Sequence, residues 1–389
     1  MRLAIILSHP TQYYSPWFRW LRTHTGLTLH VFYLWDFGVT VRRDPQFDTS
    51  FQWDTDLLSG YEHEFVPNRA ADPGTHHFRG LDNPGLTARL ADWRPDALLL
   101  FGYNWLSHQR AIWWARRRGI PLLFRGDSHL LGRSRPPLLR RWLLGFLYRR
   151  FAAVTYVGIA NRDYFLAFGV PAARLIFAPH SVDASRFNPD DPATQHEAAR
   201  LRRDHGLEGK RVLLFAGKLH PRKQPRELLR AFLAVATADD ALVFVGDGEE
   251  KTALADVSAG AEACVRFLPF ANQSEMPSRY LLGDIFVLPS RGNYETWGLA
   301  VNEAMHLGRP CLVSDRVGCQ RDLVIPGETG WVFPADDATA FAATLQVAMR
   351  APAEELQRLS TNTLARISGY TYRQTSEGLE QALATVRTR

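Results

Sequence analysis

Two successive series of short apolar runs constrain the fold of this 389-residue chain more than any other feature. The first series comprises residues 3–7, 29–34, 97–101, 121–124, 153–157 and 175–177. The second comprises residues 212–216, 241–245, 265–268, 285–288, 311–314 and 330–333. Short apolar runs that alternate with longer helical patterns are typical of parallel sheets built from βαβ units. The sequence therefore predicts an α/β fold with two doubly wound, Rossmann-like domains, which bind ligands at the carboxyl ends of their strands.

A polar segment rich in Pro, Asp and Asn separates the two series. The chain is also too long for one ordinary hydrophobic core. We therefore expect an amino-terminal domain over residues 1–178, a linker over 179–209 and a carboxy-terminal domain over 210–370. A helical pattern follows over 371–389, and the sequence leaves open whether this helix packs back on the first domain.

The composition, with 46% hydrophobic and 22% charged residues, is that of a soluble globular protein. Three cysteines without a close pair provide neither a disulfide framework nor a zinc site. The apolar core of residues 1–10 is too short for a signal peptide, and no run approaches the ~18 apolar residues of a membrane helix. We expect a cytoplasmic protein that is neither exported nor membrane-spanning.

The positive charge of the chain is unevenly distributed. The formal net charge is +6, which favours anionic partners such as nucleic acid, phosphorylated small molecules or a membrane surface. Residues 130–162 contain no Asp or Glu but include Arg133, Arg135, Arg140, Arg141, Arg149 and Arg150. Within 138–151 these arginines accompany apolar residues at helical spacing: Leu139, Trp142, Leu143 and Phe146. Two interpretations stay open, a helix that contacts an anionic membrane and an ordinary surface helix with solvated arginines.

A basic loop, FAGKLHPRK, follows the first strand of the second domain at 215–223. Gly217 allows a tight turn there. Lys218 and Lys223 are two of only four lysines in the chain, and a compact ammonium group suits a phosphate oxygen. A solvated basic loop is the alternative interpretation. Of the two, the sequence favours diphosphate binding.

A strand, a turn and a helix are predicted over 284–308, with the helix beginning near Trp297. This arrangement presents backbone N–H groups to a phosphate. Glu295 either caps the helix or binds sugar hydroxyls, and Glu303 is either a solvated or salt-bridged glutamate or a ligand of a ribose diol. Two further strand ends, at Gly246 and Phe270, would complete the rim of this site. A plain turn and a core position remain alternatives for these two residues.

The order and spacing of these motifs, together with 327–333, resemble the retaining glycosyltransferases of family 4, which have the two-domain GT-B fold. The match covers the second domain and includes the Glu-x7-Glu spacing of Glu295 and Glu303. In the linker, Val182, Asp183 and Phe187 resemble the entry into the family's second domain. Lys218 departs from the commoner arginine of the family.

The resemblance implies a role for each matching residue of the donor site. Lys218 and Lys223 would hold the diphosphate of a nucleotide sugar, Glu303 the ribose and Glu295 the hydroxyls of the donor sugar. Backbone N–H groups at the helix start would hold sugar and phosphate, and Trp297 replaces the usual phenylalanine there. The expected donor-binding residues are Gly217, Lys218, Lys223, Gly246, Phe270, Glu295, Trp297, Gly298, Leu299 and Glu303.

The first domain carries the candidates for the acceptor side. Its opening SHPTQYYSP resembles a bacterial subgroup of the family, and the loop RGDSH follows the strand at 121–124. Gly126 stands where the family often has a histidine. The acceptor-side candidates are His9, Gln12, Tyr13, Asp127 and His129. A structural role in a loop is equally open for each.

The expected chemistry is transfer of a sugar from a nucleoside diphosphate to a glycan or lipid-linked acceptor. Cations and helix N–H groups aimed at the leaving oxygen would lower the barrier. The catalytic candidates are Glu295, Lys218, Lys223 and Asp127. No DxD pair or His/Asp cluster in the loops suggests a metal, so we expect no metal and no cofactor besides the nucleotide-sugar co-substrate. Retention of configuration is implied by the resemblance.

The resemblance also suggests a setting and a donor. A UDP-sugar is the expected donor, with GDP second. The expected context is bacterial cell-surface polysaccharide or glycolipid synthesis, at the inner face of the cytoplasmic membrane.

Three other classes were weighed. A nucleotide-sugar epimerase of the same fold would also bind UDP, but the Glu-x7-Glu spacing argues against it. A dehydrogenase would need a G-x-G-x-x-G after a first strand, which the chain lacks. A nucleic-acid-binding protein would explain the charge but not paired glutamates beside a lysine loop, and no helix-turn-helix or zinc-finger signal is present.

Overall fold

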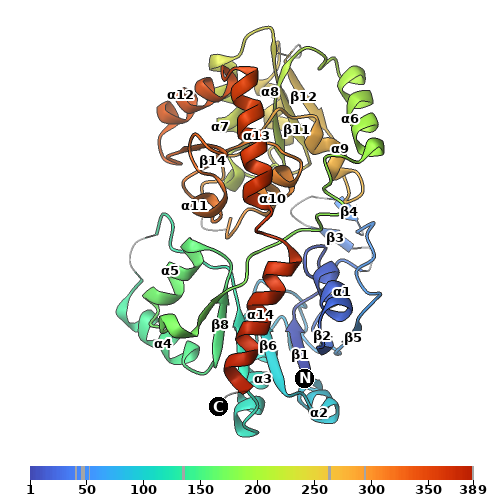
Figure 1. The fold of residues 1–389 in the computed structure, drawn as a ribbon, viewed down its shortest axis with the longest axis vertical. Helices are drawn as coiled ribbons and strands as arrows, with labels where there is room; N and C mark the ends of the chain where they lie inside the picture. The colour runs from blue at the N-terminus through green and yellow to red at the C-terminus, as the bar shows by residue number, and fades with distance from the viewer. Residues whose placement is uncertain are drawn as a thin grey trace.

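A computed structural model describes residues 1–39, 42–44, 49–51, 53–133, 136–261, 264–292 and 295–387. Two α/β domains lie one above the other, each around its own sheet (Figure 1). The prediction of two doubly wound domains is therefore confirmed. Arg135, named above among the arginines of the basic segment, lies outside the described residues, as do Asn293 and Tyr294 of the loop before the second-domain helix.

The amino-terminal domain is built on a seven-stranded sheet in the order β5-β2-β1-β6-β7-β8-β9, with parallel pairing throughout the described strands. Its strands are β1 (Arg2–Leu7), β2 (Thr28–Tyr33), β5 (Glu62–Phe65), β6 (Ala97–Phe101), β7 (Leu122–Arg125), β8 (Ala153–Tyr156) and β9 (Leu175–Phe177). Its helices are α1 (Tyr14–His24), α2 (Leu86–Trp93), α3 (Leu106–Arg117), α4 (Leu138–Tyr148) and α5 (Ile159–Ala167), with a 3-10 turn η1 (Ala172–Arg174).

The second domain has a six-stranded parallel sheet in the order β12-β11-β10-β13-β14-β15. Its strands are β10 (Arg211–Ala216), β11 (Asp240–Val245), β12 (Val265–Leu268), β13 (Ile285–Leu288), β14 (Cys311–Ser314) and β15 (Gly330–Phe333). Its helices are α6 (Pro192–Asp204), α7 (Pro225–Val235), α8 (Lys251–Val257), α9 (Met276–Leu281), α10 (Leu299–His306), α11 (Gln320–Leu323), α12 (Ala338–Met349) and α13 (Ala353–Ile367), with a 3-10 turn η2 (Pro221–Lys223). The last helix is α14 (Tyr372–Arg387).

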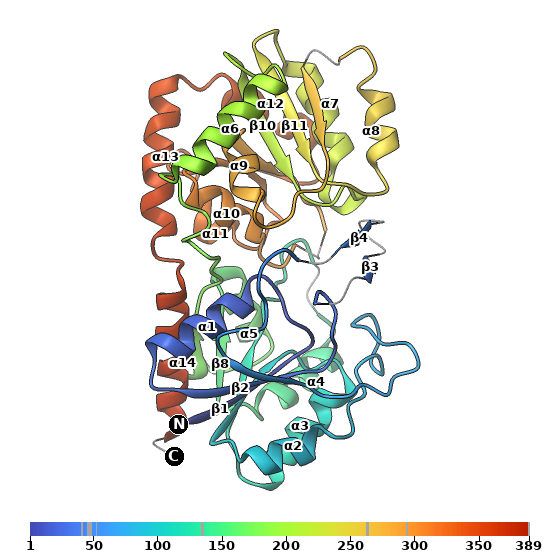
Figure 2. The ribbon, with the colours of Figure 1, turned by 90° about the vertical axis from the view of Figure 1, so that its right-hand side faces the viewer.

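The sequence analysis missed β5 and the short antiparallel hairpin β3 (Arg42–Asp44) and β4 (Thr49–Phe51). Strand β5 has the sequence EHEF and pairs only with β2, at the edge of the sheet. An edge strand is not buried on both faces, so it does not need the apolar run that marked the central strands. The hairpin lies between the two domains, apart from both sheets (Figure 2).

The central strands are apolar throughout because helices cover both faces of each sheet. In β1, Leu3 and Ile5 belong to one core cluster and Ala4 and Ile6 to another, so successive side chains enter opposite layers. The second domain repeats the arrangement in β10. This two-sided burial explains why the strands were predictable from short apolar runs.

Helix α14 follows the second domain in sequence but packs on the first. It lies along the amino-terminal domain in both views, while α13 lies on the second domain (Figures 1 and 2). Leu379, Ala382 and Leu383 are buried in the core cluster that contains Leu3 and Ile5. The segment 179–209 is likewise no simple linker, because α6 within it packs on the second domain through Ala198 and Leu201.

The chain crosses between the domains twice, once after β9 and once before α14, and hydrogen bonds join the two crossing segments. Arg125 is buried at the end of β7 and donates hydrogen bonds to the carbonyls of Ala178 and Pro179, at 2.8 and 3.1 Å. Thr375 of α14 donates to the same Pro179 carbonyl at 2.8 Å. The point where the chain leaves the first domain is thus fixed to the helix that returns to it.

A second inter-domain contact joins α5 to α11. The carboxylate of Asp322 accepts the backbone N–H of Ile159 at 2.9 and 3.1 Å, and so caps the start of α5 from the other domain. Gly158 leaves the space for this approach, since a Cβ there would lie 2.6 Å from Asp322 Oδ2. Across the described part of the chain, none of the helices is long and apolar enough to cross a membrane.

Candidate functional site

A cavity of about 410 Å³ opens between the two domains, at the carboxyl ends of both sheets. We call it the inter-domain cleft. From the first domain it is lined by His9, Gln12, Tyr13 and Asp127, and from the second by all ten expected donor-site residues. The structure therefore brings the two sets of candidates together, with His129 as the exception.

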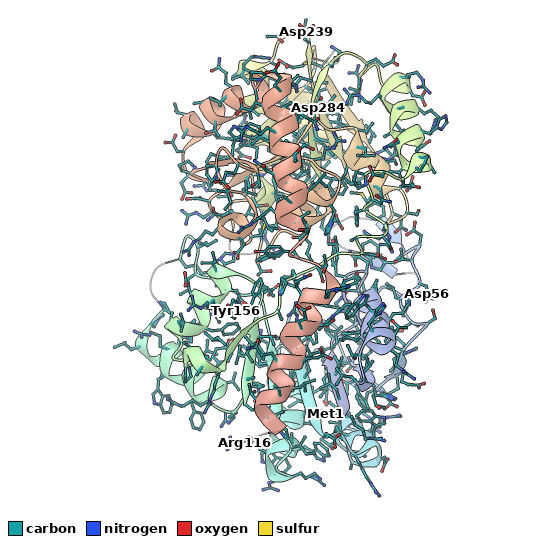
Figure 3. The ribbon with its side chains drawn as sticks, in the orientation of Figure 1. Met1, Asp56, Arg116, Tyr156, Asp239 and Asp284 are labelled. Carbon is teal, nitrogen blue, oxygen red and sulfur yellow. The ribbon has the colours of Figure 1, made fainter. Side chains whose placement is uncertain are left out.

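A larger cavity of about 620 Å³ lies at the opposite edge of the second sheet. Its lining includes Asp239 and Asp284, which stand at the outer end of the second domain, away from the first (Figure 3). It contains none of the expected residues. Parallel sheets bind ligands at the carboxyl ends of their strands, so the inter-domain cleft is the better candidate despite its smaller volume.

The amino terminus of α10 opens into the cleft without a side-chain cap. Gly298 precedes the helix with a φ of +99°, and a Cβ there would lie 2.8 Å from Val317. The helix begins at Leu299, two residues later than predicted. Its uncapped N–H groups and its dipole form a ready anion site.

Glu295 is held by an ion pair rather than acting as a helix cap. Lys223 Nζ lies 2.7 Å from Glu295 Oε2, and Ser290 Oγ donates to the same oxygen at 2.8 Å. The capping interpretation of Glu295 is therefore wrong. Its carboxylate and the Lys223 ammonium together form a charged pair on the cleft wall.

The lysine loop approaches its neighbours closely because two glycines lie side by side. A Cβ at Gly246 would lie 2.1 Å from the carbonyl oxygen of Gly217, and both residues have positive φ. The Lys223 side chain passes next to Gly217, with Cδ 3.5 Å from where a Cβ would stand. The glycines thus bring the backbone of two strand ends and the Lys223 cation to one rim.

Glu303 is buried, with only 3% of its surface exposed, so the interpretation as a solvated glutamate is wrong. Tyr280 Oη donates to Glu303 Oε2 at 2.6 Å. Oε1 has no hydrogen-bond partner among the described residues. Burial raises the pKa of Glu303 to about 7, while the hydroxyls of Tyr280 and Tyr13 oppose the shift. A buried acceptor with one unused oxygen is suited to a hydroxyl-bearing ligand.

Asp127 links the first domain to the donor loop. Thr296 Oγ1 donates to Asp127 Oδ2 at 2.8 Å, and His180 Nε2 lies 3.5 Å from the same oxygen. Burial raises the pKa of Asp127, but the nearby His180 ring and the hydrogen bond from Thr296 outweigh it, so the pKa lies below its ordinary value. Asp127 is therefore a charged carboxylate on the acceptor side of the cleft. The sequence analysis missed His180 because it lies in the crossover and meets Asp127 only in the fold.

His129 does not line the cleft. Its Nε2 lies 3.2 Å from the carbonyl oxygen of Glu295, and its Nδ1 accepts the N–H of Leu131 at 3.1 Å. Both ring nitrogens are thus engaged with backbone, and the residue is 1% exposed. The structure gives His129 the role of holding the Glu295 loop rather than that of an acceptor contact.

An aromatic wall forms the first-domain side of the cleft. His9 meets Trp35 and Phe37 edge-on, at ring-centre distances of 5.8 and 5.4 Å. Phe37 and Trp53 line the cleft beside His9. Burial lowers the pKa of His9 to about 4, so its ring is neutral at pH 7. Phe37 and Trp53 were not expected. Phe37 falls in the aromatic run LWDFG at 34–38, directly after β2, whereas Trp53 lies outside that run.

The Trp297 side chain is held within the fold. Its Nε1 donates to Asn302 Oδ1 at 2.7 Å, and Asn302 Nδ2 donates to the carbonyl of His180 at 3.2 Å. The indole is 2% exposed. Trp297 lines the cleft, and its ring connects α10 to the crossover.

A group of three metal-type ligands stands outside the cleft. Asp72, His76 and His77 place their ligand atoms within 4.8 Å of one another on a surface loop. The expectation that no His/Asp cluster occurs in the loops was therefore incomplete. Within the described part of the chain, the cleft itself has no such group.

Two family profiles match the chain and together span most of it. Residues 197–366 match the profile of glycosyl transferases group 1, and residues 39–180 match a glycosyl transferase 4-like domain.

Among curated proteins, a GDP-mannose-dependent α-(1-6)-phosphatidylinositol monomannoside mannosyltransferase of Mycolicibacterium smegmatis is 31% identical over 58% of this chain and 60% of its own length. A D-inositol 3-phosphate glycosyltransferase of Frankia alni is 29% identical over 72% of each chain. The matched region thus spans less than two thirds of the mannosyltransferase.

Solved structures share the whole fold. Anabaena HepE in complex with UDP and glucose superposes with a TM-score of 0.74 at 17% identity, over 99% of this chain and 100% of that one. Sucrose-phosphate synthase of Thermosynechococcus elongatus gives a TM-score of 0.73 at 18% identity, over 100% and 99%. Two facing α/β domains with a cleft at their strand ends are the GT-B fold. The two profile matches define the protein as a glycosyltransferase of that fold. Within that class, the chain belongs to glycosyl transferases group 1, with the 4-like amino-terminal domain of family 4.

Proposed function

We propose that this glycosyltransferase moves a sugar from a nucleoside diphosphate to a hydroxyl of a glycan or glycolipid, with retention of configuration and without a metal. One observation carries the proposal. Buried Glu303, whose Oε1 has no hydrogen-bond partner among the described residues, lines the same cleft as the Lys223 cation and the uncapped start of α10. A ribose diol, a diphosphate and a helix dipole are complementary to these three features.

The donor would lie along the second-domain wall. Its ribose hydroxyls would donate to Glu303, between the hydroxyls of Tyr13 and Tyr280. Its diphosphate would lie over the start of α10, near Lys218 and Lys223. Its sugar would then reach Glu295, and the Lys223 ammonium would be shared between that carboxylate and the phosphate.

In the proposed reaction the bond from sugar C1 to the diphosphate oxygen breaks, and the electron pair stays on that oxygen. The acceptor hydroxyl forms its bond to C1 on the same face, and its proton passes to the leaving phosphate. Lysine ammonium groups and helix N–H groups would stabilise the charge on the leaving oxygen, which makes a divalent cation unnecessary. Glu295 is poorly placed as a covalent nucleophile because Lys223 and Ser290 already hold its Oε2. Asp127 would bind the acceptor from the opposite wall.

UDP is our first candidate for the nucleoside diphosphate of the donor, and GDP is the second. Support for the two comes from different relatives. The mannosyltransferase of M. smegmatis carries GDP-mannose in its name, and the HepE structure contains UDP. We further propose that the protein works in cell-surface polysaccharide or glycolipid synthesis in a bacterium, at the inner face of the cytoplasmic membrane.

Thermal unfolding against UDP, GDP, ADP, CMP and NAD tests the donor proposal. A ligand at ~100 times its Kd adds about 2.7 kcal/mol to stability. We expect a shift with one nucleoside diphosphate, and a much smaller one in Glu303→Gln. A folded sample that shifts with none of them would contradict the proposal.

The matching nucleotide sugars would then be incubated with and without acceptor glycans, in the presence of EDTA. Transfer of sugar with retained configuration is the expected result. An epimerised nucleotide sugar formed without acceptor would instead show an epimerase, and loss of activity in EDTA would refute metal independence.

A further inference from the structure

We propose that α4 and the adjoining end of α3 form a membrane-docking surface that binds bilayers containing anionic lipid. The inference rests on the proposed function only in placing the acceptor at a bilayer. The surface itself is argued from α3 and α4.

Helix α4 presents an apolar ridge to solvent. Its five ridge residues are between 46% and 79% exposed: Leu138, Leu139, Trp142, Leu143 and Phe146. Their spacing places them on one side of the helix, and the Trp142 and Phe146 rings stack with centres 6.0 Å apart. Soluble domains rarely expose so many large apolar side chains in one place without a partner.

The orientation of α4 is fixed by contacts on its other side. Gly145 allows a close approach to the end of α5, since a Cβ there would lie 2.8 Å from the carbonyl oxygen of Phe168. Arg141 Nε donates to the Ala167 carbonyl at 3.2 Å, and Leu147 and Tyr148 are buried beneath the helix. The apolar ridge therefore points outward because its opposite face is anchored, at the outer edge of the domain (Figure 1).

Positive charge surrounds this ridge. Arg140 and Arg149 are exposed, and among the described residues neither forms an ion pair with a carboxylate. The pKa of Arg150, which lies just after α4, is lowered by partial burial and then by the nearby charge of Arg116 in the last turn of α3. Arg116 stands at the lower edge of the domain (Figure 3).

The end of α3 adds a third exposed aromatic residue, which has a cationic neighbour. Trp113 is 57% exposed, and the Arg117 guanidinium lies 3.7 Å from its ring centre. Tryptophan and arginine are the side chains that sit well at a lipid headgroup layer, the ring in the interface and the guanidinium reaching phosphate. Because residues 130–162 contain no acid, the surface complements an anionic bilayer.

Vesicle flotation tests the proposal on the full chain. Wild-type protein should float with vesicles of equimolar phosphatidylglycerol and phosphatidylcholine, and not with phosphatidylcholine alone. The double variant Arg140→Gln/Arg149→Gln should bind these vesicles roughly thirtyfold more weakly. Each arginine near an anionic surface raises the affinity about fivefold, and the two contributions multiply. Its matched control, Arg203→Gln/Arg230→Gln, changes two exposed arginines on α6 and α7 and should bind like wild type.

The apolar ridge has its own variant, Trp142→Ser/Phe146→Ser, which should lose flotation even at low salt. A wild-type protein that floats with neither vesicle would overturn the proposal, as would an equal loss in the control pair. If the ridge variant abolished self-association in sedimentation while flotation stayed unchanged, the surface would be an interface between copies instead.

The nucleotide-dependent thermal shift, measured on the same variants, separates this inference from the donor site. Variants that lose flotation should keep the shift. A wild type that floats but shows no nucleotide shift would contradict the proposed function and leave the docking surface standing.

Discussion

Lys223 and Glu295 join two loops of the second domain through a contact of 2.7 Å between Nζ and Oε2. Both side chains are largely buried, and Ser290 holds the same carboxylate oxygen. The pair places a cation and an anion side by side, at the position where the diphosphate and the sugar of a donor would meet. The first predictions concern this pair.

Lys223→Ala should lower the rate of transfer by ~10²–10³, because the leaving oxygen loses a fixed cation. Donor affinity should fall as well, as measured by nucleotide titration. The control is Lys251→Ala on α8, whose ammonium pairs with Asp247 outside the cleft. Unchanged donor affinity in Lys223→Ala would remove Lys223 from the site.

Glu295→Gln should separate binding of the sugar from binding of the nucleotide. We expect unchanged affinity for the free nucleoside diphosphate and weaker affinity for the nucleotide sugar, because Glu295 is assigned to the sugar hydroxyls. Titration calorimetry with both ligands measures the difference. Equal losses for the two ligands would refute the division of roles between Glu295 and Glu303.

Nucleotide affinity should rise with pH across the pKa of Glu303. Burial raises this pKa from its ordinary value of 4.5 to about 7, and only the deprotonated carboxylate accepts both hydroxyls of a diol. Affinity measured between pH 6 and pH 8 should therefore increase and then level off, while Glu303→Gln should give a flat profile. A wild-type profile without this rise would exclude the carboxylate from the ribose site.

The same group predicts the opposite trend for the ligand-free protein. The folded state holds this proton more tightly than the unfolded chain, so the stabilisation is complete below pH 4.5 and is lost as pH rises through about 7. In the absence of nucleotide, the melting temperature of wild type should therefore fall relative to Glu303→Gln between pH 4.5 and pH 7, and the difference should level off above pH 7. A constant difference between the two proteins would contradict the raised pKa.

The cap that Asp322 supplies to α5 should contribute to global stability. Asp322→Ala removes the acceptor for the Ile159 N–H and should cost about 1–2 kcal/mol in urea unfolding. Asp163→Ala is the matched control, since Asp163 joins the same two helices through an exposed ion pair with Arg321 at 2.7 Å. The control should cost less than ~1 kcal/mol. An equal cost for both variants would show that the buried cap contributes no more to the free energy of unfolding than the exposed ion pair does.

Trp297→Phe should destabilise the protein without changing donor binding. The indole Nε1 donates to Asn302, and its loss leaves a buried amide oxygen unpaired at a cost of about 1–3 kcal/mol. The backbone N–H of residue 297, which the family resemblance assigns to donor binding, is kept. A large rise in donor KM with unchanged stability would place the ring itself in the site.

Much of the second-domain site was predictable because its signals are local. Gly217, the two lysines and the glutamate spacing lie at strand ends and a helix start, and those elements follow from short apolar runs and turn residues. What escaped was set by the meeting of distant segments. Tyr280 and Glu303 are 23 positions apart in the sequence, and the residues around either of them do not predict their hydrogen bond.

The first domain was harder for the same reason. His129 is a polar residue in a loop after a strand. A residue that binds the acceptor would show the same sequence pattern. Only the fold shows that the carbonyl of Glu295, from the other domain, occupies its ring nitrogen. Strand β5 escaped because an edge position relaxes the demand for apolar residues on both faces.

The return of α14 to the first domain has a consequence for how the chain is made. Leu3 and Ile5 are synthesised well before Leu379 and Ala382, which complete their layer and follow every described strand of both sheets. Trp17, Phe18 and Leu21 of α1 can cover part of this layer early, but the part beneath α14 stays open while the second domain is made. The amino-terminal domain therefore completes its core only after α14 has been synthesised.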